Sequence, residues 1–239
     1  MTRILVLQHH PEEGLGSLHN ILAAEGHQTD VHRLDLGVSV PDDLDLADYG
    51  ALIIMGGPMS VHDTDRYPWL LTEQRIIRRA VVEELPVLGH CLGAQLIAQA
   101  MGGEVSPNPD GPEIGWWPVT KTPEAMGSTW FTELPDTFTL FHWHGETFSL
   151  PSAAVPLLSS DLCAQQAFAI GKHCLALQGH PEVTPTTVQA WTESMADDLQ
   201  RTGAGVQSRQ TIHDHLERRC EALLASAAAI YRPWLEQLR

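Results

Sequence analysis

Residues 86–93 read Pro86-Val87-Leu88-Gly89-His90-Cys91-Leu92-Gly93, and they carry the clearest structural signal in the chain. The short apolar run predicts a buried strand, and the apolar spacing from Leu92 to Met101 predicts a helix directly after it. A glycine two residues to either side of Cys91 is the pattern of a nucleophile elbow, with cysteine in place of serine. Such a turn lifts the side chain off the sheet, and the start of the next helix favours the thiolate, the reactive form of cysteine. The stretch therefore predicts a strand–turn–helix unit with Cys91 at its tip.

The same alternation of strand and helix extends in both directions from this unit. Upstream, the apolar pattern predicts strands at 4–7, 31–34 and 51–55, with helices around 18–22 and 70–80. Downstream, it predicts strands at 117–121, 138–143, 155–159, 167–170 and 174–178, and then helices at 188–199 and 212–230. Apolar strands that alternate with amphipathic helices indicate an α/β fold with a mostly parallel central sheet covered on both faces. We expect the apolar stripe of the last helix to pack on its own domain.

The composition is that of an ordinary globular protein, since 43% of the 239 residues are hydrophobic and 18% are charged. This length predicts a single domain over 1–239, in which 187–239 form a C-terminal helical extension. The net charge of −16 disfavours nucleic acid and membrane surfaces as partners, and the acidic stretch 42–48 reads as a solvated connection. Four scattered cysteines make no disulfide framework, and we find neither a signal peptide nor an apolar run of membrane-spanning length. We therefore expect a soluble, cytoplasmic protein.

A thiolate needs a base and an oxyanion site, and the sequence offers candidates for both. His180 follows an apolar strand, and reactive groups in α/β sheets lie just beyond the carboxyl ends of parallel strands. Glu182, two residues on, can accept the other N–H of His180 and hold its tautomer. The N–H of Leu92 is one natural oxyanion donor, and Gly57, in the loop after strand 51–55, is our candidate for the second. These residues form a complete set of nucleophile, base and orienting acid.

Other interpretations of these residues are weaker. A lone cysteine is more often a small core residue than a nucleophile, but the elbow, the glycine loop and the histidine at a strand end occur together here. The pairs His142 and His144, or His213 and His215, lack the further ligands of a closed metal site. Gly14-Leu15-Gly16 lacks the third glycine of a dinucleotide loop. An α/β-hydrolase esterase would place the acid before the histidine.

The chain resembles the class I glutamine amidotransferases, in particular the amidotransferase domain of GMP synthase and its stand-alone relatives. The resemblance rests on Gly-Gly-Pro at 56–58, Gly-His-Cys-Leu-Gly-Ala-Gln at 89–95, His-Gly-Glu at 144–146 and Gln-Gly-His-Pro-Glu-Val-Thr at 178–184. These segments fall in the family's order and cover most of residues 1–186. The resemblance implies a flavodoxin-like three-layer domain that hydrolyses the side-chain amide of glutamine without a cofactor or metal.

The resemblance also implies roles for individual residues. Cys91 would attack the amide carbon to form a thioester, and His180 would protonate the departing ammonia. Gln95 matches a residue near the bound glutamine, and Glu146 matches the position that holds its amino-acid end. Trp143 and His144 are expected to line the same pocket. The chain departs from the family pattern at Gly179, where relatives have a bulky residue, at Glu146, where aspartate is commoner, and at Trp143, where the GMP synthase branch has serine.

Two functions fit these residues. The first is a glutamine amidotransferase, or glutaminase, that delivers ammonia to an unidentified acceptor; a separate synthase subunit is one such partner, since we find no ATP-pyrophosphatase domain or phosphate loop in the sequence. The alternative is a γ-glutamyl peptidase or hydrolase, which would use the same triad on a small γ-glutamyl compound. Typical γ-glutamyl hydrolases have arginine after the nucleophile, whereas this chain has Leu92, and this favours the amidotransferase.

Overall fold

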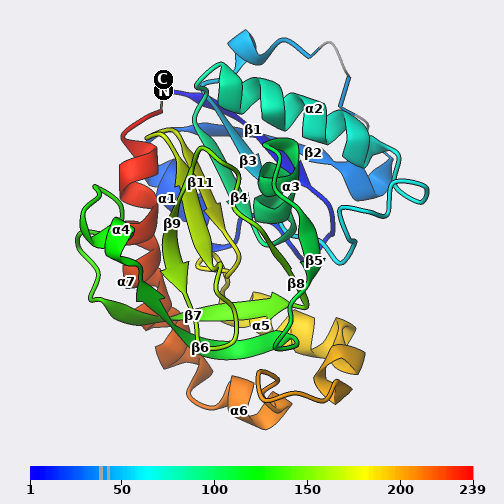
Figure 1. Ribbon diagram of the computed structural model, residues 1–239, viewed down its shortest axis with the longest axis vertical. Helices are drawn as coiled ribbons and strands as arrows, with labels where there is room; N and C mark the ends of the chain where they lie inside the picture. Colours follow the sequence, from blue (N-terminus) through cyan, green and yellow to red (C-terminus); the bar gives the residue numbers. More distant parts are fainter. Residues whose placement is uncertain (38–39, 42–43, 239) are drawn as a thin grey trace.

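The computed structural model describes residues 1–37, 40–41 and 44–238 (Figure 1). Asp42 and Asp43, which begin the expected acidic connection, and Arg239 lie outside the described residues. The strands are β1 (Arg3–Gln8), β2 (Gln28–Arg33), β3 (Ala51–Ile54), β4 (Val87–His90), β5 (Val105–Pro107), β6 (Glu113–Lys121), β7 (Thr137–His144), β8 (Glu146–Phe148), β9 (Ala154–Ser159), β10 (Ala167–Ile170) and β11 (Cys174–Leu177). The α-helices are α1 (Ser17–Ala24), α2 (Trp69–Val82), α3 (Leu92–Ala100), α4 (Pro123–Met126), α5 (Pro185–Ser194), α6 (Arg209–His213) and α7 (Leu216–Leu235).

A nine-stranded sheet in the order β2-β1-β3-β4-β11-β10-β9-β6-β7 forms the centre of the molecule. Its first five strands are parallel, in the order 2-1-3-4-5 that is typical of flavodoxin-like folds. This confirms the expected α/β fold and its parallel sheet. The other four strands are antiparallel, because the short turn from β10 to β11, among others, leaves no room for a crossover helix.

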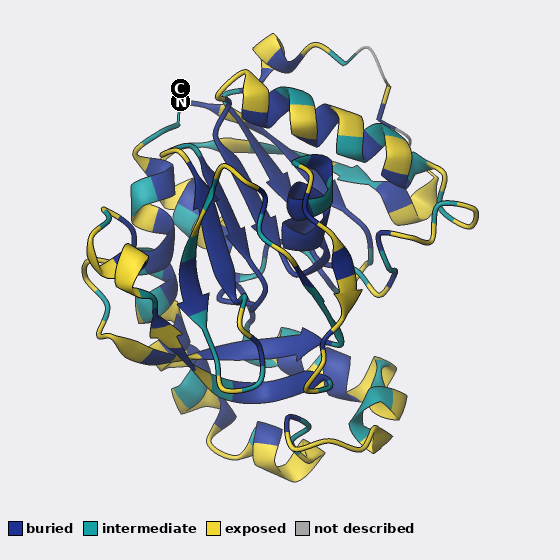
Figure 2. Cartoon of the chain, in the orientation of Figure 1, coloured by how far each residue is buried: buried dark blue, intermediate teal, exposed yellow. Residues whose placement is uncertain are grey.

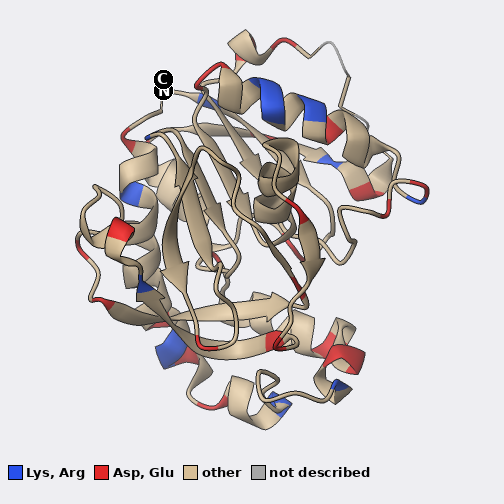
Figure 3. Ribbon diagram, viewed as in Figure 1, with Lys and Arg blue, Asp and Glu red and all other residues tan. Residues whose placement is uncertain are grey.

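Helices cover both faces of the sheet, as the continuous apolar strands predict. On β1, Leu5 and Leu7 pack with α2 and α3, while Ile4 and Val6 pack on the opposite side with α1, α5 and α7. Figure 2 shows the resulting dark interior between helices whose outer faces are exposed. In Figure 3 acidic residues are spread over many loops and helices, and basic residues gather visibly on α2. Among the described residues, no helix combines the length and apolarity that crossing a membrane requires.

The C-terminal helices differ from the expected ones in their boundaries. The helix expected at 188–199 ends at Ser194 and continues as a 3-10 helix, Ala196–Gln200. The helix expected at 212–230 is broken into α6 and α7, because Asp214 is extended and His215 has a φ of 53°. The apolar stripe of α7 is buried in the same core cluster as α1 and α5, so this helix does pack on its own fold. The two-stranded sheet of β5 and β8 was not expected, since each strand has only three residues.

Candidate active site

The elbow is a tight turn in which the backbone of Cys91 has an unusual conformation. Cys91 has a φ of 49°, in a region that residues other than glycine rarely adopt. Its backbone N–H donates to the Leu177 carbonyl at 2.8 Å. A Cβ on Gly89 would lie 2.7 Å from the Gly93 backbone, and one on Gly93 would lie 2.2 Å from the Ile54 carbonyl oxygen. The two glycines are therefore required by close approach of β4, α3 and β3, which holds the sulfur above the sheet.

His180 and Glu182 lie beside Cys91, directly after β11. The backbone N–H of His180 donates to the Phe141 carbonyl at 2.8 Å. The imidazole Nδ1 of His180 lies 2.7 Å from Glu182 Oε1. The edge of its ring meets the Trp191 indole at a centroid distance of 4.8 Å. Burial acts to lower the pKa of His180, but the Glu182 carboxylate and the Cys91 sulfur outweigh it and raise this pKa well above its usual value. The environment thus favours an imidazolium next to the sulfur.

Two buried residues that the sequence analysis did not single out stand behind Glu182. Glu182 Oε2 lies 3.8 Å from His90 Nε2, and that nitrogen also lies 2.9 Å from the hydroxyl of Tyr231 on α7. Burial would raise the pKa of Glu182, but the neighbouring His90 and His180 lower it below its usual value. Burial lowers the pKa of His90. The C-terminal helix therefore supports the carboxylate that orients His180.

The glycine loop after β3 lies opposite the elbow. Neither Gly57 N–H nor Leu92 N–H has a hydrogen-bond acceptor among the described residues, so both can serve a substrate oxygen. The Gly56 carbonyl lies 3.0 Å from Nδ1 of His9, whose Nε2 lies 2.9 Å from Glu73 Oε1. Burial opposes the charged form of His9, but Glu73 raises its pKa above the usual value. Since a carbonyl and a carboxylate both accept, His9 donates from both nitrogens and holds the loop in place.

The elbow, the histidine and the glycine loop border one cavity of 410 Å³. It is lined by Glu13, Gly57, Pro58, Met59, Ser60, Asp63, Cys91, Gln95, Pro107, Ile114, Trp143, His144, Gly145, Glu146, His180, Trp191, Met195, Asp198 and Arg201. Seven of the nine candidate site residues are on this wall. The exceptions are Leu92, which is fully buried, and Glu182, which bonds to His180 from outside the cavity wall.

The four candidate substrate-binding residues differ in how free they are. Glu146 accepts a hydrogen bond from the Ser60 hydroxyl at 3.1 Å, and Gln95 Nε2 donates to the Glu146 carbonyl at 3.3 Å. The Trp143 indole N–H donates to Asp198 at 3.0 Å, and the Trp143 carbonyl lies 3.7 Å from Cys91 Sγ. His144 Nδ1 is hydrogen-bonded to the Glu146 carbonyl at 3.0 Å, whereas its Nε2 lies 3.0 Å from Glu113 without forming a well-directed hydrogen bond.

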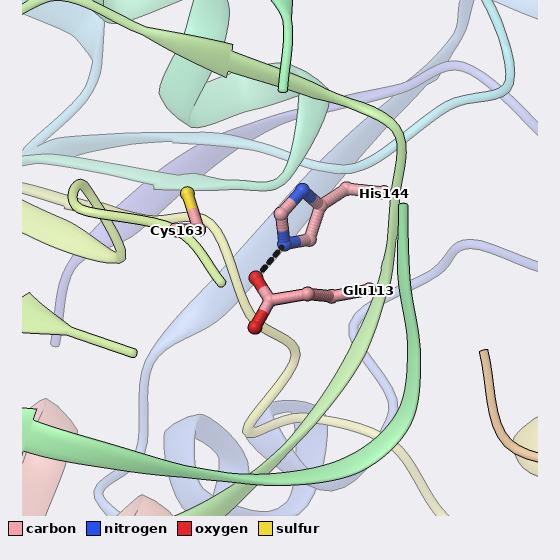
Figure 4. A group of neighbouring side chains, drawn as sticks. All are labelled: Glu113, His144 and Cys163. Carbon is pink, nitrogen blue, oxygen red and sulfur yellow. Dashed lines mark ion pairs between the residues drawn. The ribbon is translucent and has the colours of Figure 1, made fainter. Parts of the chain in front are cut away.

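Within the described residues, one group has the side chains of a metal site. Ligand atoms of Glu113, His144 and Cys163 lie within 4.8 Å of one another, and Figure 4 shows His144 Nε2 directed at Glu113, 3.0 Å away. The Glu113 carboxylate already accepts hydrogen bonds from Ser160 and Gln166, at 2.6 and 2.5 Å. These contacts describe a hydrogen-bonded network that anchors the segment 144–146.

Gly16, in the stretch that resembles part of a dinucleotide-binding loop, has a structural role. A Cβ on Gly16 would lie 2.1 Å from the Glu182 carbonyl oxygen, and the Ser17 N–H donates to that oxygen at 2.8 Å. Gly16 therefore permits the start of α1 to pack against the segment that carries Glu182. Of the histidine pairs that the sequence analysis set aside as metal ligands, His142 is fully buried with neither ring nitrogen hydrogen-bonded, and burial lowers its pKa to about 3. His213 is bonded to Thr192 at 2.7 Å.

This fold brings a buried cysteine, histidine and glutamate together at the carboxyl ends of its parallel strands, an arrangement typical of cysteine-dependent hydrolases. The family model for glutamine amidotransferase class I matches residues 15–195, and the chain belongs to that family. A glutamine amidotransferase-like protein of Salmonella typhimurium, YfeJ, is 28% identical over 220 residues, which are 91% of this chain and 89% of the relative. Gamma-glutamyl peptidase 4 of Arabidopsis thaliana is 34% identical over 175 residues, 70% of this chain and 68% of the relative. The crystal structure of a glutamine amido transferase from Methylobacillus flagellatus has a TM-score of 0.90 at 35% identity, covering 99% of this chain and 95% of the other.

Proposed function

We propose that this protein hydrolyses a γ-glutamyl amide bond through a Cys91 thioester, with the side-chain amide of glutamine as the first candidate substrate. The observation that carries the proposal is the line of contacts from Glu182 through His180 to Cys91 at the wall of the cavity. A buried histidine whose imidazolium form is favoured, next to a cysteine on an elbow, supports a reactive thiolate.

The residues fit the steps of acyl transfer. The Cys91 thiolate attacks the amide carbon, and the N–H groups of Gly57 and Leu92 receive the charge that develops on oxygen. His180 then gives its proton to the amide nitrogen, the C–N bond breaks, and ammonia or an amine leaves. A water molecule, deprotonated by His180, attacks the thioester and releases glutamate and the cysteine. Glu182 keeps the tautomer and orientation of His180 through both halves.

The far end of the cavity supports recognition of the glutamyl part. Glu146, fixed by Ser60, is our candidate for the substrate's α-amino group, and Gln95 lies next to it. Trp143 and His144 form the wall between this end and the sulfur. In the amidotransferase version of the proposal, the released ammonia passes to an acceptor, which a separate synthase subunit would carry.

The second candidate function is γ-glutamyl peptidase or hydrolase. It is compatible with the size of the cavity, since 410 Å³ falls in the range of roughly 300–1,000 Å³ typical of small-molecule sites. It is favoured by the relatives named gamma-glutamyl peptidases, which match this chain over 66–70% of its length.

The test is the release of glutamate from L-glutamine and, in parallel, from a γ-glutamyl dipeptide. Wild-type protein is compared with Cys91→Ala, and with Cys220→Ala as a control, because Cys220 is buried outside the cavity. We expect Cys91→Ala to lose activity while keeping its fold by circular dichroism. Release from glutamine supports the amidotransferase, and release from the dipeptide alone supports the peptidase. Full activity in Cys91→Ala would refute the mechanism.

A further inference from the structure

Glu13 is a buried carboxylate in the cavity that the proposed reaction does not use. It lies in the loop between β1 and α1, is 6% exposed and lines the cavity. Among the described residues, no side chain or backbone N–H donates to its carboxylate. Burying a carboxylate without a hydrogen bond costs several kcal/mol unless a ligand compensates it.

Glu13 lies beside the imidazole of His180, the group that protonates the leaving nitrogen in the proposed reaction. A Cβ on Gly56 would be 2.2 Å from Glu13 Oε2 and 3.2 Å from His180 Cε1, so the carboxylate and the imidazole edge share that space. His180 faces Cys91 on one side and Glu182 on the other. A group attached to the nitrogen that His180 protonates would therefore pass close to Glu13.

The other carboxylates of the cavity already have partners. Asp63 accepts from the Ser60 N–H at 2.9 Å, Glu146 accepts from the Ser60 hydroxyl, and Asp198 accepts from the Trp143 indole. Arg201 is the lining arginine, and it lies 3.8 Å from Asp198. Among the described residues, the wall near His180 thus carries an acid without a hydrogen-bond donor, while the arginine of the cavity pairs with Asp198. This charge favours a positively charged leaving group and disfavours a carboxylate.

We infer that Glu13 binds a positive charge on the departing amine, so that the preferred substrates are γ-glutamyl amides of amines that carry a second, cationic nitrogen. The inference rests on the proposed function, and it names the substrate class of the same site. Ordinary γ-glutamyl dipeptides, whose leaving amino acid is anionic, are then poor substrates. Burial raises the pKa of Glu13 to about 7, against the opposing charges of His180 and His9, and a bound ammonium group would relieve that cost.

Three amides with four atoms in line beyond the amide nitrogen test this assignment: the γ-L-glutamyl amides of butylamine, 1,3-diaminopropane and β-alanine. They place a neutral, a cationic and an anionic end at one position. The measured quantity is kcat/KM for each amide with wild-type protein, Glu13→Gln and the control Glu12→Gln. Glu12 is a suitable control because its carboxylate bonds Ser194 and lies outside the cavity.

We expect wild-type protein to prefer the cationic over the neutral amide by about 10- to 100-fold, the size of one charge-assisted hydrogen bond. Glu13→Gln should bring this ratio close to one, and Glu12→Gln should leave it unchanged. Any effect of the substitution on His180 cancels in the ratio of kcat/KM between the cationic and neutral amides, since both amides use the same triad. A preference that persists in Glu13→Gln, or a wild-type preference for the neutral or anionic amide, would overturn the inference.

Binding separates this inference from the proposed function. The dissociation constants of the three amides are measured with Cys91→Ala and with Cys91→Ala/Glu13→Gln by calorimetry. If no amide is hydrolysed, the proposed function fails, yet tighter binding of the cationic amide that is lost with Glu13 still supports the assignment. Equal affinity for the cationic and neutral amides would refute it whatever the activity.

Discussion

The Gly56–Gly57 peptide must face one way for Gly57 to serve as an oxyanion donor. In a trans peptide the C=O and the N–H point in opposite directions, so the hydrogen bond from His9 Nδ1 to the Gly56 carbonyl turns the Gly57 N–H away from His9. Removing that bond frees the peptide to rotate. We therefore predict that His9 acts as a positioning residue for the oxyanion donor, although it touches no substrate.

Two substitutions separate the two hydrogen bonds of His9. The amide nitrogen of asparagine can occupy the place of Nδ1, and that of glutamine the place of Nε2. His9→Gln should keep the contact with Glu73 and lose the one with Gly56, and His9→Asn should do the reverse. Comparing the two substitutions is informative because the His9 and Glu73 side chains are almost fully buried. Leaving the buried Glu73 carboxylate without a partner lowers the free energy of unfolding by about 3–5 kcal/mol.

We expect His9→Gln to lower mainly the activity and His9→Asn to lower mainly the stability. A hydrogen bond from a charged donor contributes about 1.5–3 kcal/mol, so His9→Gln should lower kcat about 10- to 100-fold with KM nearly unchanged. Complete loss of an oxyanion donor costs about 100- to 1,000-fold in kcat, which sets the upper limit. His9→Asn should keep kcat within about fivefold but lose about 3 kcal/mol or more of unfolding free energy. The assay is glutamate release, with urea unfolding followed by circular dichroism. A His9→Gln variant with wild-type kcat, or one in which only KM rises, would refute the reasoning.

Three further predictions concern the fold around the triad. Tyr231→Phe removes the hydroxyl that bonds His90, and should cost about 1–3 kcal/mol in urea unfolding; no change would show that the bond contributes nothing. Gly93→Ala would place a Cβ 2.2 Å from a carbonyl oxygen of β3, and should destabilise the protein by about 3 kcal/mol or more or prevent its soluble expression. The ion pair of His180 and Glu182 stabilises the fold while the histidine is charged. Because the pKa of His180 is raised in the folded protein, this stabilisation is complete below about pH 6.5, and it is lost as the pH rises through the raised pKa. The stability difference between wild-type protein and Glu182→Gln should shrink as the pH rises above about 6.5, and a difference that stays constant up to the alkaline unfolding of the protein would contradict the assigned charge.

The parts of the fold that sequence predicts well are those whose signal is local. Strand 167–170 matches β10 with the same ends, and the elbow at Cys91 lies between β4 and α3 as its glycines indicate. Direction within the sheet is not a local property, because it depends on how a connection returns. The expected strands of the second half are present, yet four strands of the sheet run antiparallel to their neighbours.

The candidate site shows the same division. Cys91, His180 and Glu182 are predictable from short motifs that sit at strand ends. His9 and Glu13 also follow a parallel strand, and asking which polar residues come directly after β1 would have found them. Tyr231 had no such signal, because its contact with His90 spans 141 residues and depends on how α7 docks.

The C-terminal segments take part in the site although they lie mostly beyond the family match, which ends at residue 195. Trp191 packs on the edge of His180, Asp198 holds the Trp143 indole, and Tyr231 reaches the back of the triad. We propose that residues 187–239 belong to the same domain as the elbow, because these contacts join the extension to His180, Trp143 and His90. Because Asp198 and Arg201 line the cavity, and Arg201 lies against Gly145, we expect this extension to contribute to substrate choice as well.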